Sequence, residues 1–231
     1  MSYLWQEFNI KTFPAETLVF RDGVFCPDLS EYESVEYNDT KKLIFTKKTS
    51  KLPVHIIYIG EIAGKIDLNI DINIEKSRLF MTMKISNKKP AFLNIFIKNT
   101  GKKSFFDGKI TVKNTSELEI NETGEHLSSN TGIFLKNRVV AYKNSTTILK
   151  GYAKIEKKAK HCDSDISFSV LADKTAKITM TPTQYIKAVP ESASHSASIY
   201  KPTENQIQYL RTSGLAEKEI KQILEEAFIE E

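Results

Sequence analysis

The sequence is poor in the residues that mark several protein classes. It has two cysteines, Cys26 and Cys162, and no CxxC pair, so no zinc or iron–sulfur ligand set can be read from adjacent cysteines. A single disulfide is arithmetically possible, but a cytosolic setting disfavours it. No apolar run approaches the about 20 residues of a membrane span. The first residues, MSYLWQEFNIKTF, lack the basic start and apolar block of a secretory signal. We therefore expect a cytoplasmic protein without a membrane partner.

Arginine is scarce as well, although the chain carries a formal net charge of +4. The 33 basic residues include only four arginines, Arg21, Arg78, Arg138 and Arg211. Proteins that read nucleic acids favour arginine because its guanidinium makes paired contacts with guanine and phosphate. The densest basic run, KIEKKAK at 154–160, is typical of a solvated strand face. We expect no nucleic-acid partner.

Sequence motifs of catalysis are also missing. The chain contains no GxSxG, Walker, HExxH or glycine-rich dinucleotide pattern, and we interpret it as a non-enzyme. The densest group of ligand-type residues is HCDSD at 161–165, where Cys162 would face away from His161 on a strand because side chains alternate. This group is more typical of a polar strand end than of a metal site. Cys162 stays a weaker candidate for a functional residue.

Two other histidines have ordinary settings. His55 lies in KLPVHIIYIG and is interpreted as a packing residue of a strand. His126 lies in a stretch rich in glycine, glutamate, asparagine and serine, and is interpreted as a solvated turn residue.

Two-residue periodicity is what the chain has in abundance. IDLNIDINI at 66–74 alternates isoleucine or leucine with aspartate or asparagine, which predicts a strand with one buried face. Similar strands recur at intervals of about 10–12 residues. They are expected at 78–86, 91–99, 108–114, 132–137, 146–156, 166–173 and 176–188.

Strands at this spacing fit a β-sandwich, a barrel or a β-solenoid. Signals for tight hairpins are few, and the clearest, RDGVF at 21–25, precedes the main array. Polar and β-branched residues recur at the ends of the strands, as stacked coils allow. These observations favour a solenoid, although no fixed repeat period is visible.

After residue 202 the periodicity becomes helical. Thr203 and Gln206 have the spacing of a capping box, and Gly214 is suited to end a first helix. A second helix follows, with apolar residues at helical spacing. We divide the chain into a β-domain with an amino-terminal hairpin at 1–202 and a helical segment at 203–231.

Two helices of this length are not stable alone, so their apolar side chains must be buried. They either cap their own domain or dock into the groove of a partner. The residues expected to bind such a partner are Leu210, Leu215, Ile220, Ile223, Leu224 and Phe228.

His195 has the most distinctive setting of the four histidines. It lies in ESASHSASIYKPTENQ at 191–206, between two serines, with Ala193 and Ala197 on its strand face. Small neighbours leave the imidazole accessible to a ligand, and they also let another backbone approach closely. Both interpretations, a ligand contact and a hydrogen-bonded interface residue, stay open on residue type alone.

Three features of the carboxyl-terminal third occur together in one known family. They are the strand KITMTPTQYIKA, the histidine of SASHSAS thirteen residues after Pro182, and the helical pair ENQIQYLRTSGLAEKEIKQILEEAF. In these features the chain resembles the SufB/SufD family, the scaffold proteins of the SUF iron–sulfur assembly system. TLVFRDGVFCPDLSE at 17–31 is similar to the hairpin that precedes the core in SufD-type members, and KLPVHIIYIG is similar to the strand that follows it.

The resemblance implies a right-handed parallel β-helix with a carboxyl-terminal helical hairpin. It implies that two subunits pair through the β-helix edge, as a homodimer or with a SufB-type subunit, and that the helices dock a SufC-type ABC ATPase. Motion of the ATPase would rearrange the interface where an iron–sulfur cluster is assembled transiently, so no stably bound cofactor is expected. His195 matches the family histidine that helps to hold the cluster, which makes it the candidate iron contact.

The chain also departs from the family pattern. Members carry a sizeable helical amino-terminal domain, whereas residues 1–16 are all that precede the hairpin here. The cysteine of SufB-type members would lie near Ser167, five positions after Cys162, and their glutamate after the histidine is Ser196. These differences point to a minimal SufD-like member.

Two further classes stay open. One is a structural β-domain that self-associates through strand edges. The other is a β-helix enzyme acting on polysaccharides, which needs a groove with paired acids, whereas the acids here are scattered.

Overall fold

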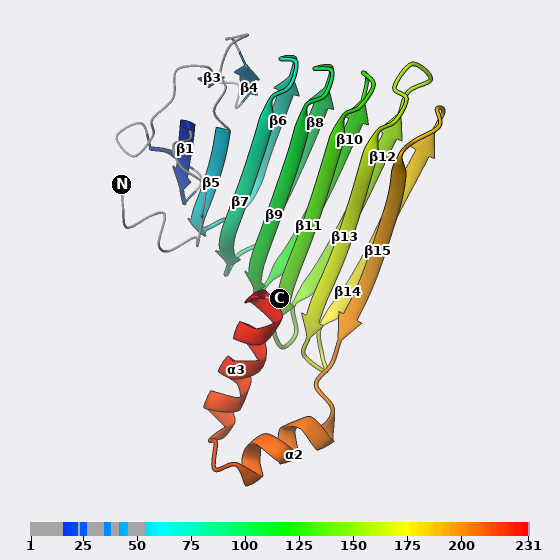
Figure 1. The fold of residues 1–231 in the computed structure, drawn as a ribbon. Helices are drawn as coiled ribbons and strands as arrows, with labels where there is room; N and C mark the ends of the chain where they lie inside the picture. Colours follow the sequence, from blue (N-terminus) through cyan, green and yellow to red (C-terminus); the bar gives the residue numbers. More distant parts are fainter. Residues whose placement is uncertain (1–15, 23, 27–34, 38–41, 46–53, 231) are drawn as a thin grey trace.

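A computed structural model describes residues 16–22, 24–26, 35–37, 42–45 and 54–230. Within these residues the chain winds as a solenoid of two facing sheets, with two helices at one edge (Figure 1). The strands of the first sheet are β1 (Glu16–Arg21), β2 (Val24–Phe25), β5 (Val54–Glu61), β7 (Arg78–Asn87), β9 (Phe105–Asn114), β11 (Gly132–Ala141), β13 (Asp163–Ala172) and β15 (Ser192–Tyr200). The strands of the second sheet are β3 (Val35–Tyr37), β4 (Lys42–Phe45), β6 (Gly64–Ile72), β8 (Ala91–Asn99), β10 (Glu117–His126), β12 (Thr146–Ile155) and β14 (Lys177–Ile186).

The strand order shows the winding. From β5 onward successive strands enter the two sheets alternately, and each pairs in parallel with the strand two further along the chain. The result is a right-handed parallel β-helix of about five turns, which confirms the predicted fold class. Antiparallel pairing is confined to β1 with β2 and β3 with β4 within the described residues. The β1–β2 pair is the hairpin that RDGVF predicted.

The repeat length varies along the solenoid. Arg78 pairs with Phe105 and Phe105 with Gly132, an offset of 27 residues in each case. Gly132 pairs with Asp163, which is 31 residues further on. The strands keep their length while the turns between them differ, and this is why the sequence shows no fixed period.

The core lies between the two sheets. The inward side chains of β6 are the aliphatic members of its alternating pattern, and none of them is more than 8% exposed: Ile66, Leu68, Ile70 and Ile72. Equivalent rows from the other strands stack on these, with each large aliphatic side chain contributing about 1.5–3 kcal/mol. The outward members of the pattern face solvent.

Buried polar side chains stabilise the corners of the coils. Asn87 and Asn114 are neighbours in the stack, and both are fully buried. The Nδ2 group of Asn87 donates to the carbonyl oxygen of Glu117 at 3.0 Å, and that of Asn114 donates to the carbonyl oxygen of Thr146 at 2.9 Å. These bonds give a partner to main-chain carbonyl groups at the turns, where the regular hydrogen bonds between strands end.

Strand β10 was not predicted, and the interpretation of His126 as a solvated turn residue is wrong. His126 is the last residue of β10 and is fully buried, with its Nδ1 atom 2.8 Å from the hydroxyl oxygen of Thr131. The inward row of this strand also contains Glu122 and Gly124. These residues break the apolar alternation on which the strand prediction depended.

His55 has the predicted role. It is 4% exposed on β5 and stacks on the ring of Phe80 with centroids 5.0 Å apart. Burial lowers the pKa of His55.

The helices are α2 (Glu204–Thr212) and α3 (Glu217–Glu230). The predicted capping box is present, because the Thr203 hydroxyl accepts from the Gln206 amide and the Gln206 side chain accepts from the Thr203 amide. Gly214 follows the first helix with a φ of 86°, as a glycine stop requires. In the part of the chain that the structure describes, no helix is long and apolar enough to cross a membrane.

Candidate interfaces at the carboxyl-terminal end

Strand β15 ends the first sheet and carries His195. Its register with β13 places His195 opposite Ile166 and Ala197 opposite Phe168. Ile166 and Phe168 are buried inward residues, so His195 and Ala197 continue the inward row of the solenoid. Within the described residues no further coil covers this row, and both side chains are exposed. His195 is therefore accessible at the open end of the solenoid.

Strand β14 ends the second sheet in the same way. Its inward residues include Met180 and Gln184, which continue the row of β12 and are half-buried. The Nε2 group of Gln184 donates to the main-chain oxygen of Ser194 at 2.6 Å and bridges the two terminal strands. Large apolar side chains are exposed around this end: Tyr185, Ile186, Val189, Ile199 and Tyr200. Two adjacent strand edges with exposed apolar residues form a surface suited to contact another protein.

The outward face of this end is lined with small hydroxyl groups. Ser194 donates to the Asp165 carboxylate at 2.7 Å, and Ser192 donates to the Asp163 carboxylate at 2.9 Å. The residues next to His195 therefore make short, local contacts, and none of them fills the space beside the imidazole with a large side chain.

Cys162 lies inside the protein, immediately before β13. It is fully buried, and its sulfur contacts the Thr131 hydroxyl at 3.2 Å and the Ser128 carbonyl oxygen at 3.3 Å. Ala188 and Ala193 from the last turn pack against the small cluster that contains it. The prediction that His161 and Cys162 face apart assumed a strand, whereas both residues precede β13 and His161 has a φ of 53°. His161 is exposed while Cys162 is buried.

The structure does not bring Cys162 and His195 together. Ile166, the residue of β13 opposite His195, comes four residues after Cys162 in the chain, which is about 13 Å at strand spacing. Among the described residues no group of three or more His, Cys, Asp or Glu side chains is arranged to hold a metal ion. Iron at this end would therefore need ligands from elsewhere in addition to His195.

Helix α3 is fixed to the outside of the first sheet. Arg138 on β11 donates to the main-chain oxygens of Phe228 at 3.0 Å and Ile229 at 3.2 Å. The Phe228 ring also meets the ring of Tyr200, with centroids 5.5 Å apart. These contacts join α3 to both β11 and the end of β15.

A buried carboxylate adds a second attachment. Glu225 is 8% exposed and accepts a hydrogen bond from the Tyr142 hydroxyl at 2.7 Å. Lys113 lies 3.6 Å from the same carboxylate, and Lys221 lies over the Tyr142 ring. Burial and the bond to Glu225 raise the pKa of Tyr142, so the phenol is protonated and donates at physiological pH.

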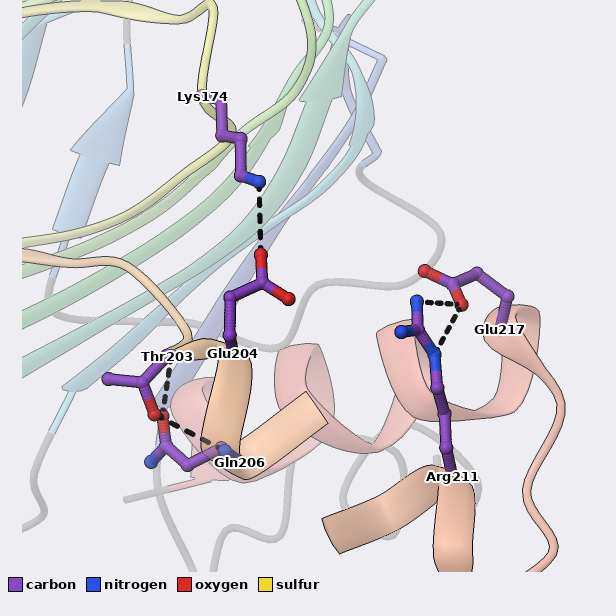
Figure 2. A network of polar contacts seen from close by, with 6 residues as sticks. All are labelled: Lys174, Thr203, Glu204, Gln206, Arg211 and Glu217. Atoms are coloured by element: carbon purple, nitrogen blue, oxygen red, sulfur yellow. Dashed lines mark hydrogen bonds and ion pairs between the residues drawn. The ribbon is translucent and has the colours of Figure 1, made fainter. Parts of the chain in front are cut away.

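Helix α2, in contrast, has no buried residue. Figure 2 shows the ion pairs on this side, Lys174 with Glu204 at 3.2 Å and Arg211 with Glu217 at 2.8 Å. A cavity of about 430 Å³ lies between the helices and the carboxyl-terminal ends of β11 and β13, with Leu171 among its apolar lining residues. Exposed ion pairs contribute little stability, so α2 is held less firmly than α3.

The residues predicted to bind a partner divide into two groups. Ile220 and Phe228 are buried against the chain's own structure at 3% and 8% exposure. The others are half-buried or exposed: Leu210, Leu215, Ile223 and Leu224. Tyr209, which was not predicted, is the most exposed aromatic residue of the helices at 71%. The spacing of apolar residues along a helix does not show which of them pack against the chain's own β-domain and which stay free for a partner.

The comparisons with known proteins agree with the fold. Residues 45–228 match the family model described as the SufBD core domain of SUF system FeS cluster assembly. A search of curated proteins finds no match. The matched segment covers well over half of the chain and contains the open end of the solenoid, α2 and most of α3. The chain therefore belongs to the SufBD family of the SUF iron–sulfur cluster assembly system.

Proposed function

We propose that this chain is a SufD-like scaffold that pairs with a second SufB/SufD-type subunit through the open end of its solenoid and docks a SufC-type ABC ATPase through its helices. Family membership supports a part in iron–sulfur cluster assembly. The observation that carries the pairing is the uncovered inward row of β14, which is half-buried, and of β15, where His195 and Ala197 are exposed; a second solenoid would cover both. The iron–sulfur cluster is the cargo of this pair, and the chain itself performs no catalytic step.

Exposed apolar side chains on the two helices support the docking of the ATPase. Tyr209 and Ile223 are 71% and 39% exposed, so they are free to enter a groove of a partner. Ile220 and Phe228 hold α3 on the solenoid instead. Because α3 is fixed to β11 and β15, a displacement of the helices would pull on the edge strand β15 and on β11 within the same sheet.

The proposal is tested by binding of the purified chain to a SufC-type ATPase. Tyr209→Asp and Ile223→Asp should abolish binding, because each places a charge in the proposed contact without touching the core. Gln208→Asp, a polar exposed residue of α2, should leave binding intact and serves as the control. Failure of the wild-type chain to bind any SufC-type ATPase would refute the docking, and equal binding by all variants would refute the assigned face.

Self-association is the second candidate function, because the open ends of two identical chains can pack against each other. Mixing the chain with a SufB-type subunit decides between the two. A mixed dimer that replaces the homodimer supports the SufD-like assignment, and a homodimer that persists supports the self-associating domain.

A further inference from the structure

Glu122 is buried inside the solenoid. It occupies an inward position of β10 and is 1% exposed. Its neighbours in the second sheet are Ile95 and Gly151, and neither has a polar side chain. An ionised carboxylate in this place would be an uncompensated charge among apolar groups, which is costly.

Asn137 meets Glu122 from the opposite sheet. It is an inward residue of β11, 1% exposed, and its Nδ2 group donates to Oε2 of Glu122 at 2.8 Å. Its own neighbours in the first sheet are Ile110 and Phe168. The two polar side chains thus form an isolated pair that links the sheets across the core.

Two atoms of this pair are left without a partner. Oε1 of Glu122 and Oδ1 of Asn137 are both buried and make no hydrogen bond. Both are acceptors as long as the carboxyl group is ionised, so they cannot satisfy each other. A proton on Oε1 makes that atom a donor, and Oδ1 of Asn137 is an acceptor that has no other partner.

We propose that Glu122 is a neutral acid in the folded protein and pairs reciprocally with Asn137, as a proton-dependent clasp between the two sheets. In this clasp Nδ2 donates to Oε2 and Oε1 donates to Oδ1. Burial supports it, because desolvation raises the pKa of Glu122 to about 8 against the opposing effect of the bond from Asn137. The inference does not depend on the proposed function.

Other ionisable groups do not provide the missing charge. The described inward side chains of β8, β9, β10, β11, β12 and β13 include one other titratable group, His126. It lies four residues from Glu122 on β10, which is about 13 Å. Burial lowers the pKa of His126 to about 4, so it is neutral throughout the range in which Glu122 titrates.

The clasp predicts how stability depends on pH. The pKa of Glu122 is raised from 4.5 to about 8 on folding, so the stabilisation is complete below pH 4.5 and is lost as the pH rises to about 8. Glu122→Gln keeps both hydrogen bonds without a proton. The folding equilibrium constant of the wild type should therefore fall about tenfold per pH unit relative to Glu122→Gln in this window. Denaturant titrations between pH 5 and pH 9 measure this ratio.

Infrared spectroscopy tests the proton directly, including the case in which the variant does not fold. Near pH 6.5 exposed carboxyl groups are ionised, and the wild-type chain should show the carbonyl stretch of a protonated acid. This band should be absent from Glu122→Gln and retained in Glu125→Gln, which changes an outward carboxylate of the same strand that pairs with Lys154. A wild-type spectrum without the band, or a stability ratio that does not change with pH, would overturn the clasp.

Discussion

The guanidinium of Arg138 holds the end of the last helix, because its Nη1 donates at 3.0 Å to the main-chain oxygen of Phe228, 90 residues further along the chain. The last carbonyl groups of a helix have no partner within the helix, and a cation is favourable at that end. Arg138 supplies both the donor and the charge. A residue in the middle of the solenoid therefore fixes the segment proposed to contact the ATPase.

Replacement of Arg138 should release α3 from the solenoid. Arg138→Ala removes hydrogen bonds from a charged donor, each worth about 1.5–3 kcal/mol. We expect faster amide hydrogen exchange in α3, while the strands of the core keep their protection. Lys136→Ala, an exposed outward residue of the same strand, is the matched control. Unchanged exchange in α3 of the Arg138 variant would show that the other contacts suffice to hold the helix.

A charge in the exposed inward row should prevent pairing. Ala197 lies beside His195 in the row that a second subunit would cover, and Ala197→Lys adds a long cation there. We expect dimer affinity to fall on the order of a hundredfold, the effect of a disrupted interface centre. Sedimentation velocity across a concentration series measures it.

The control for pairing is Lys109→Glu, an exposed outward residue of β9. It also alters the charge of an exposed side chain, in the opposite direction, and it lies on a strand in the middle of the sheet. A dimer that resists Ala197→Lys, or dissociates equally with Lys109→Glu, would place the contact elsewhere.

The regular part of the fold was predictable because its inward rows are apolar. Strands such as β6 show this alternation without a break, and the solenoid follows from many strands with few hairpin signals. β10 was missed because Glu122 and His126 occupy inward positions, where an apolar residue is expected. The hydrogen-bond partner of Glu122 lies on the next strand, and that of His126 lies across a turn. Local periodicity carries no information about such partners.

The candidate site was predictable only in part. The position of His195 on a terminal strand follows from the sequence, but its exposure depends on the absence of a covering coil within the described structure. For the helices, the spacing identified the apolar residues. Which of these residues are buried and which stay exposed depends on how Arg138 and Glu225 fix α3 to the first sheet. Those contacts join residues far apart in the chain.

Cys162 should resist thiol reagents in the native protein. Its sulfur is buried beneath Ala188 and Ala193, so a reagent reaches it only when the last turn opens. In a Cys26→Ser background, labelling should be at least about a thousandfold slower than in urea. Mass spectrometry after timed labelling gives the rate, and rapid native labelling would show that Cys162 is accessible to a sulfur donor.

Replacement of His195 should reduce iron binding and leave the pairing of the two subunits intact. Its side chain is exposed in the row proposed to be covered by the second subunit, and small neighbours leave room for iron beside the imidazole. After anaerobic reconstitution of the pair with iron and sulfide, His195→Ala should bind less iron while the dimer persists. His161→Ala is the matched control, because it removes another exposed histidine at a turn outside this row. Equal iron and sulfide content in wild type and His195→Ala would leave His195 as an interface residue, whereas a loss of the dimer would show that its role is in pairing.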